Sequence, residues 1–139
     1  MKYYEDFYFS FLQYQYKYYQ GVFANPDKCI YKDVGLFPEL IFASGLIPAI
    51  IEVIVGMIPP NIVSESILNK ADQYFYDNGA CSFNKFALPA LESGNLPLPK
   101  AFASIAVCQE ATNNFSLLAH KYGRPHLTID YPYKYDSTA

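Results

Sequence analysis

Residues 101–130, AFASIAVCQEATNNFSLLAHKYGRPHLTID, decide the fold that we expect for this chain. The apolar run at 102–107 is typical of a short buried strand, and residues 109–122 have the length of a helix. A turn at 123–125 then leads into a second short apolar run at 126–129. A strand, a helix and a second strand of these lengths, in this order, predict a βαβ unit with parallel strands and a right-handed crossover.

The part of the chain before this unit alternates helix-like and strand-like runs. Residues 3–19 carry aromatic side chains at helical spacing and predict an amino-terminal helix. The next stretch, 22–37, contains turn residues and is interpreted as a loop. Pro38 suits the first position of a short helix that Gly45 ends. The isoleucine- and valine-rich run at 46–54 predicts a buried strand.

Two further helices are expected at residues 62–76 and 82–93, the second kinked or shortened by Pro89. Together these elements predict an α/β domain of the Rossmann-like or flavodoxin-like type, with three layers built around a short parallel sheet. We expect two parts: an amino-terminal helix at residues 1–21 and the α/β domain at residues 22–139.

The composition is that of a globular protein. A length of 139 residues suits a single domain. Charged residues make up 17% of the chain, against about 25% in a typical domain, so we expect a large core or a surface that packs against a partner. The net charge of −3, with no basic patch, argues against binding to nucleic acid. The 14 tyrosines suit interfaces and half-buried faces.

The cysteines indicate the compartment. There are three of them, Cys29, Cys81 and Cys108, and they are widely spaced. The amino terminus carries acids and glutamines where a signal peptide needs an apolar run. These features predict a cytoplasmic protein with free or metal-bound thiols. We expect Cys29 to be a structural thiol, and His120 and His126 to lie at the surface.

The apolar run at 40–57 raises the question of a membrane segment. It contains Glu52 and three helix breakers, Gly45, Pro48 and Gly56. A spanning helix needs about 20 apolar residues with few charges, and a carboxylate inside the hydrocarbon layer is costly. A buried helix followed by a buried strand is therefore favoured, so that no membrane contact is expected. A small membrane-associated protein is the alternative.

Cys81 and Cys108 are the candidate ligands of a soft metal. Cys108 follows a predicted parallel strand and precedes a helix, and ligands collect at the carboxyl ends of strands in open α/β sheets. Cys81 also precedes a predicted helix, whose amino terminus stabilises a thiolate. Two such thiols could converge on one metal or iron–sulfur cluster. On spacing alone, the alternative of two small buried side chains is favoured.

Six short motifs follow one another along the chain: ELIFASGLIP (39–48), NGACSF (78–83), GNLPLP (94–99), CQEATNNF (108–115), YGRP (122–125) and IDYPY (129–133). Their order and spacing resemble the amino-terminal part of an iron–sulfur subunit of the 2-hydroxyacyl-CoA dehydratase / benzoyl-CoA reductase family. The resemblance covers residues 36–135. Lys100 and Gln109 depart from it, since each stands where that family often has Asp.

The resemblance implies a [4Fe–4S] cluster in each subunit, bound by three cysteines. Two of these match Cys81 and Cys108. The third comes from a second domain, so the α/β domain at 22–139 is expected to be truncated relative to the family. The implied partners are a second subunit or second domain, an ATP-dependent activator that donates one electron, and an acyl-CoA substrate. The implied reaction is 2-hydroxyacyl-CoA dehydration or ring reduction of the benzoyl-CoA type.

Glu52 is the candidate catalytic residue, because it lies on the strand that the family places near its substrate, where it would polarise or position the thioester. The alternative for Glu52 is a strand-end glutamate that faces solvent. For the whole chain, the alternative function is a non-catalytic binding or assembly module of the same fold, with the tyrosine-rich first helix as its docking surface.

Overall fold

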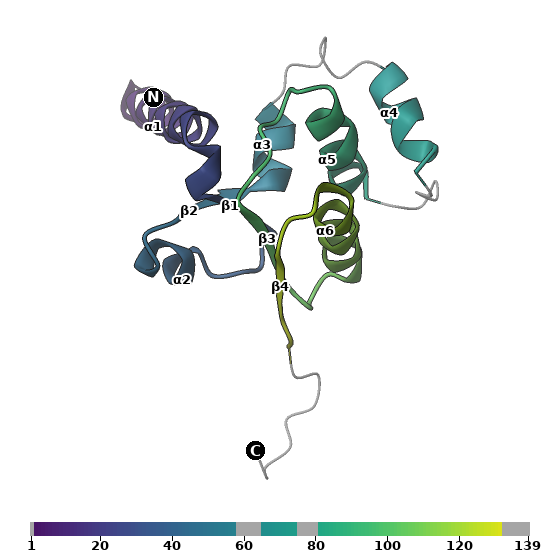
Figure 1. The fold of residues 1–139 in the computed structure, drawn as a ribbon. Helices are drawn as coiled ribbons and strands as arrows, with labels where there is room; N and C mark the ends of the chain where they lie inside the picture. Colours follow the sequence, from purple (N-terminus) through teal and green to yellow (C-terminus); the bar gives the residue numbers. More distant parts are fainter. Residues whose placement is uncertain (1, 58–64, 75–80, 132–139) are drawn as a thin grey trace.

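The computed structural model describes residues 2–57, 65–74 and 81–131 (Figure 1). In chain order the elements are α1 (Lys2–Ala24), the 3-10 helix η1 (Pro26–Lys28), β1 (Cys29–Lys32), α2 (Pro38–Ala43), β2 (Ile47–Ile50), α3 (Ile51–Met57), α4 (Glu65–Asp72), α5 (Ser82–Glu92), β3 (Ala101–Ile105), α6 (Gln109–Tyr122) and β4 (His126–Ile129).

The described strands form one sheet in which every pairing is parallel, in the order β2-β1-β3-β4. The helix α2 lies on one side of this sheet, and α3, α5 and α6 lie on the other (Figure 1). The result is a three-layer α/β fold, as the sequence predicts. The strand order is that of the first four strands of a flavodoxin-like sheet.

The path of the chain creates a switch point between β1 and β3. From β1 the chain passes through α2 to β2, at one edge of the sheet. It then returns past β1 to β3 and moves on through α6 to β4, at the other edge. The connections after β1 and β3 therefore run in opposite directions. In open α/β sheets, ligands bind at the carboxyl ends of such a pair of strands.

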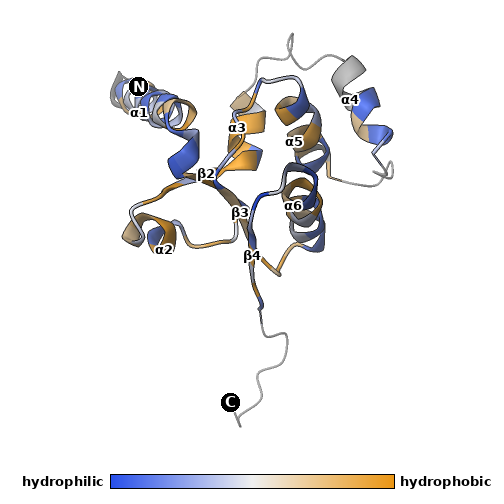
Figure 2. Ribbon diagram, viewed as in Figure 1, coloured by the Kyte–Doolittle hydropathy of each residue, from blue (hydrophilic) through white to orange (hydrophobic). Residues whose placement is uncertain are grey.

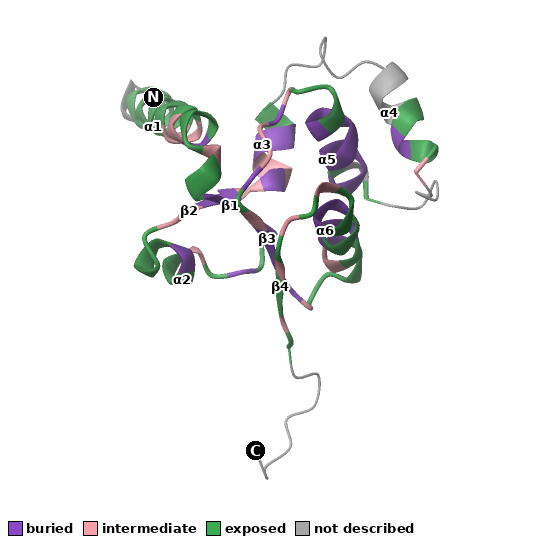
Figure 3. Ribbon diagram, viewed as in Figure 1, coloured by how far each residue is buried: buried purple, intermediate pink, exposed green. Residues whose placement is uncertain are grey.

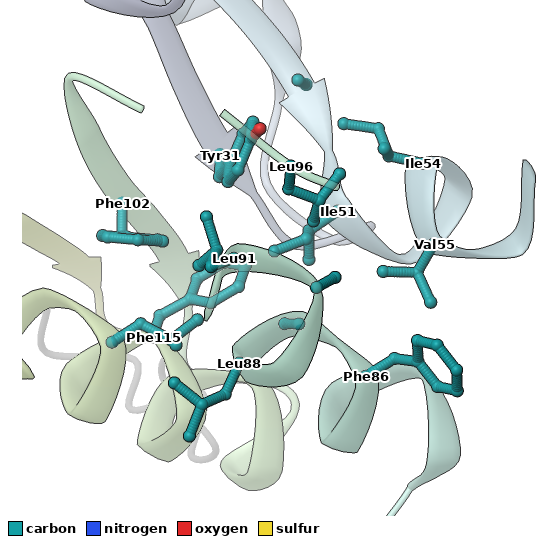
Figure 4. Packing of buried hydrophobic residues seen from close by; sticks show 14 of the residues in the cluster. Tyr31, Ile51, Ile54, Val55, Phe86, Leu88, Leu91, Leu96, Phe102 and Phe115 are labelled. Carbon is teal, nitrogen blue, oxygen red and sulfur yellow. The ribbon is translucent and has the colours of Figure 1, made fainter. Parts of the chain in front are cut away.

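Two hydrophobic clusters hold the layers together. The larger one lies between the sheet and α3, α5 and α6, where Tyr31, Phe102 and Phe115 meet (Figure 4). The ring centroids of Phe102 and Phe115 are 5.8 Å apart. The smaller cluster lies on the α2 side and includes Ile30 and Ile105. Successive residues of β1 thus face opposite layers, as the pleat of a strand requires. Figure 3 shows the buried residues concentrated on the strands and on the inner faces of the helices.

The carboxyl-terminal βαβ unit confirms the sequence prediction. The predicted helix at 109–122 and the strand at 126–129 have the observed bounds, and the strand predicted at 102–107 is β3. Gly123 ends α6 with φ of 61°, a left-handed conformation that glycine adopts without steric cost. The Arg124 N–H then donates to the Ala119 carbonyl at 2.9 Å, which completes a glycine-capped helix end.

The loop predicted for residues 22–37 is wrong, because it contains β1, a central strand of the sheet. Only four residues form this strand, and one of them is Lys32. Hydrogen-bond partners on both sides, β2 and β3, stabilise the extended conformation. Tertiary pairing thus overrides a weak local signal. The helix α1 also continues through Gly21 to Ala24.

The single strand predicted at 46–54 is also wrong. It is a short strand, β2, followed directly by the helix α3. Isoleucine and valine favour strands only weakly, and here the residues after Ile50 pack as a helix, with Ile51, Ile54 and Val55 buried. Figure 2 shows α3 as mainly hydrophobic. Of the helix predicted at 62–76, Glu65–Asp72 is helical, residues 73 and 74 form a turn instead, and both predicted ends lie outside the described residues.

The apolar run at 40–57 is divided among α2, β2 and α3. Within the described residues, no helix combines the length and the apolar character that crossing a membrane requires.

Candidate functional site

Asp33 occupies the switch point between β1 and β3. Its side chain is buried, with 2% exposure. Oδ1 accepts a hydrogen bond from the Leu36 N–H at 2.8 Å, and Oδ2 accepts one from the Ile105 N–H, also at 2.8 Å. One carboxylate therefore joins the loop after β1 to the end of β3. The sequence prediction missed Asp33 because β1 itself was not recognised.

The same two loops approach closely at Gly35. A Cβ added at this position would lie 2.8 Å from Cγ2 of Ile105, closer than real Cβ contacts. A residue without a side chain is therefore required where the loop after β1 crosses the end of β3.

Cys108 lies three residues beyond β3 and is the N-cap residue of α6. Cys81 is the N-cap residue of α5. Both are free and exposed, and neither side chain caps its own helix. Both candidates thus stand at helix starts, as the sequence predicts. Cys29 is different: it is buried, and burial raises the pKa of its thiol to about 12, in agreement with a structural role.

The structure brings the two cysteine-bearing loops together. The Cys81 N–H donates to Oε2 of Glu110 at 2.9 Å, and Glu110 lies in the first turn of α6. One turn further along both helices, Nδ2 of Asn114 donates to the Asn84 carbonyl at 3.1 Å. The first contact joins the starts of the two helices, and the second lies one turn further along both. The helices α5 and α6 are therefore parallel. Cys81 and Cys108 therefore start neighbouring helices, both at the carboxyl ends of the strands.

The donor set fits part of an iron–sulfur site. Thiolates are the usual ligands of such clusters, and Cys81 and Cys108 are two exposed thiols at positive helix ends. In the part of the chain that the structure describes, no group of three or more His, Cys, Asp or Glu residues is placed to hold a metal ion. The described residues therefore offer two exposed thiols as candidate ligands and place no third ligand beside them.

Glu52 lies in the first turn of α3, directly after β2, and not within a strand as the sequence predicts. It is half-buried, and its Oε2 is buried with no hydrogen-bond partner among the described residues. Burial raises the pKa of this carboxyl group, and the nearby Asp33 adds to the increase. The backbone N–H groups of Glu52 and Val34 and the charge of Lys32 oppose it. Glu52 is thus not the solvent-facing glutamate of the alternative interpretation.

Lys32, at the end of β1, is a buried cation that the sequence prediction also missed. It is 1% exposed, and its ammonium group donates to the Asp33 carbonyl at 2.5 Å. Burial lowers the pKa of Lys32, while the charges of Asp33, Glu52 and Glu39 oppose that decrease. The carboxyl ends of β1 and β2 therefore combine a buried amine with a carboxyl group that ionises less readily than usual.

A cavity of about 240 Å³ opens between α1, α2 and the sheet edge at β2. Its walls are mostly aromatic and apolar, and its charged lining residue is Lys32. The lining residues are Phe11, Tyr14, Gln15, Tyr18, Tyr19, Lys32, Pro38, Phe42, Pro48 and Ile50. The Tyr18 hydroxyl donates to the Pro48 carbonyl, which attaches α1 to β2.

The two histidines differ. His120 is exposed, as predicted. His126 is half-buried against the Phe115 ring, and its Nε2 is 3.0 Å from the Ser104 hydroxyl. It is therefore only partly at the surface. Burial lowers the pKa of its imidazole, and the charge of Asp33 opposes this. Asp130 accepts a hydrogen bond from the Tyr131 N–H at 2.9 Å and so braces the turn after β4.

Comparison with protein-family models and with curated proteins gives no match for this chain. Fold and site together define a class of protein: a parallel, flavodoxin-like α/β domain with two exposed thiols at the starts of neighbouring helices.

Proposed function

We propose that this chain is a [4Fe–4S]-binding domain of an enzyme that reduces an acyl-CoA, of the 2-hydroxyacyl-CoA dehydratase / benzoyl-CoA reductase type. One observation carries the proposal. Cys81 and Cys108, both free and exposed, start two parallel helices at the carboxyl edge of the sheet. The six ordered motifs that resemble this family support it.

In this proposal Cys81 and Cys108 are two of three protein ligands to the cluster. The amino-terminal ends of α5 and α6 carry partial positive charge, which complements the negative charge of a cluster bound there. The third ligand comes from a second domain or a second subunit. When bound, such a cluster supplies one-electron transfer and a Lewis-acidic iron.

Glu52 is the candidate for positioning the acyl-CoA thioester. Its carboxyl group is half-buried at the carboxyl end of β2, where burial raises its pKa. A protonated carboxyl group donates a hydrogen bond, and a thioester carbonyl accepts one. Further proposed partners are an ATP-dependent electron-donating activator and the acyl-CoA itself. Free, exposed thiols suit a reducing, cytoplasmic location.

The test is anaerobic purification of the full chain together with its co-purifying partners, followed by analysis for iron and acid-labile sulfide. Iron and sulfide in equal amounts, together with an absorbance change on adding an acyl-CoA, support the proposal. A complex that contains neither iron nor sulfide contradicts it.

A second candidate function, a non-catalytic assembly module, is favoured by the surface of α1. Figure 3 shows most of this helix as exposed. Its exposed large apolar residues are Tyr4, Phe7, Tyr8, Phe9, Phe11, Leu12, Tyr14, Tyr16 and Phe23. The end of α1, around Tyr18, Tyr19 and Val22, packs on the domain core. Such an aromatic surface is typical of a protein-binding site.

The double substitution Tyr4→Asp and Phe7→Asp tests the assembly function. Both rings are exposed, and neither lines the cavity beside β2 or belongs to the buried core, so the substitutions leave the domain core intact. If α1 is the docking surface, the double variant no longer co-purifies with its partner. The matched control Gln13→Asp lies on the opposite side of the helix and is expected to keep the partner. An iron-free complex that depends on these two rings favours assembly over catalysis.

A further inference from the structure

Glu110 makes a contact that neither the family motifs nor the predicted helix pattern assigns. It lies two positions after Cys108, in the first turn of α6. There its negative charge complements the positive end of the helix. Its Oε2 also accepts the hydrogen bond from the Cys81 N–H, at 2.9 Å. A single side chain therefore connects the backbone of one cysteine to the helix turn that the other cysteine starts.

This contact is one of two hydrogen bonds that join α6 to the first turn of α5. The Cys81 carbonyl accepts from the N–H groups of Asn84 and Lys85, both at 3.0 Å, which forms the first turn of α5. The Cys81 N–H precedes that turn and has no acceptor inside α5, because the first N–H groups of a helix lack partners within it. Glu110 supplies that acceptor. Asn114, four residues on and on the same face of α6, holds the Asn84 carbonyl.

The start of α6 is fixed in a similar way. The Cys108 carbonyl accepts from the Thr112 N–H at 3.1 Å. The backbone positions of both cysteines are therefore set by the first turns of their helices, and Glu110 links these two turns. Phe115 and Leu118 provide the core packing of α6. Loss of the link is therefore expected to change the separation of the two sulfur atoms more than the packing of the core.

We propose that Glu110 is a positioning residue, which holds Cys81 at the distance from Cys108 that joint binding of one bridging group requires. This inference rests on the proposed function, in which both thiols bind one cluster. It goes further by assigning the geometry of the pair to a residue that is not itself a ligand. In the described structure Glu110 acts through a backbone N–H.

Bridging of the two thiols by dibromobimane measures this geometry directly. Each thiol displaces one bromide, so two C–S bonds form, two C–Br bonds break, and two bromide ions and two protons leave. The reagent becomes strongly fluorescent only after both displacements. Cys81 and Cys108 are exposed to it, whereas Cys29 is buried and unreactive in the folded protein. Alkylation by iodoacetamide, which needs only one thiol, reports the reactivity of each cysteine separately.

The variants are Glu110→Ala, Glu110→Gln and the matched control Gln109→Ala, all in the full chain. Gln109 is exposed in the same helix turn, but its side chain donates to Oδ1 of Asn113, within α6 itself. We expect Glu110→Ala to slow bridging about tenfold, in line with the loss of one charge-assisted hydrogen bond. Alkylation of the single thiols should stay within about twofold. Glu110→Gln keeps an oxygen that accepts the N–H and is expected to restore most of the bridging rate, while Gln109→Ala bridges like the natural chain.

Three results would overturn the proposal: an unchanged bridging rate in Glu110→Ala, a natural chain whose thiols do not bridge, or equal slowing in Glu110→Gln and Glu110→Ala. If the first of these results comes with a lower thermal unfolding temperature, the role of Glu110 is structural only. Iron and sulfide analysis of the natural chain is separate from this assay. A protein that bridges as expected but binds no iron rejects the cluster and retains the role of Glu110.

Discussion

The Asp33 carboxylate accepts a hydrogen bond from the backbone N–H of Ile105, which lies 72 positions further along the chain, at 2.8 Å. The bond joins the carboxyl ends of β1 and β3 at the point where the chain reverses its direction of winding. The Ile105 carbonyl in turn accepts from the Val107 N–H at 2.7 Å, at the start of the loop that carries Cys108. The position of this cysteine therefore depends on a buried acid at the end of another strand.

Replacing Asp33 with Ala is expected to destabilise the domain by about 3 kcal/mol, because two buried N–H groups then lose their acceptor. Asp33→Asn should lower the free energy of unfolding by about 2 kcal/mol, since an amide offers one acceptor oxygen in place of two. Urea unfolding followed by circular dichroism measures both values. The exposed Asp27→Asn serves as the control and is expected to change stability by less than about 0.5 kcal/mol. Equal stability of Asp33→Ala and the natural chain would contradict this role.

A second prediction concerns Gly35. Gly35→Ala forces the new methyl group against Ile105, so we expect a loss of about 1–2 kcal/mol of unfolding free energy. In an Ile105→Ala background the clash disappears, and the same substitution should cost less than half as much. A double-mutant cycle by urea unfolding gives the coupling between the two sites. Strictly additive effects would show that the contact with Ile105 is not the cause.

The third prediction uses the pH dependence of stability at Glu52. Burial raises the pKa of this carboxyl group above 4.5, so its contribution to stability is fully present below pH 4.5 and is lost as the pH rises through the folded-state pKa. Glu52→Gln removes the ionisation. We expect this variant to be more stable than the natural chain at pH 7 by roughly 1 kcal/mol, with the difference vanishing below about pH 4.5.

Thermal unfolding of Glu52→Gln and of the natural chain, measured from pH 4 to pH 8, checks the sign of this stability difference. The exposed control Glu5→Gln should follow the natural chain within about 0.5 kcal/mol. A Glu52→Gln variant that is less stable at pH 7 than at pH 4, relative to the natural chain, would show that the ionised carboxylate is the stabilising form.

The sequence predicts the carboxyl-terminal βαβ unit closely because each of its boundaries has a local cause. Gly123 supplies the left-handed residue that ends α6, and the apolar runs on either side are short and clear. The positions of Cys81 and Cys108 at helix starts follow from the same local patterns. For these elements, local preference and tertiary packing agree.

The remaining parts depend on contacts between distant residues. β1 is a four-residue strand containing a lysine, and pairing on both sides stabilises it. The run after Ile50 forms a helix because that arrangement buries Ile51, Ile54 and Val55. The contacts of Asp33 with Ile105 and of Glu110 with Cys81 join residues that no sequence spacing relates. They could be found only once the sheet order and the helix directions were known.

The most direct test of the central claim is anaerobic reconstitution of the full chain with ferrous iron and sulfide, in excess small thiol that can occupy the open ligand positions. The natural chain is expected to retain about four iron and four sulfide per molecule, with the paramagnetic resonance spectrum of a reduced [4Fe–4S] cluster. Cys81→Ser and Cys108→Ser should each lose most of this iron, while Cys29→Ala, which alters a buried structural thiol, should retain it. A natural chain that retains no iron, or cysteine variants at 81 and 108 that retain as much as the natural chain, would contradict the account.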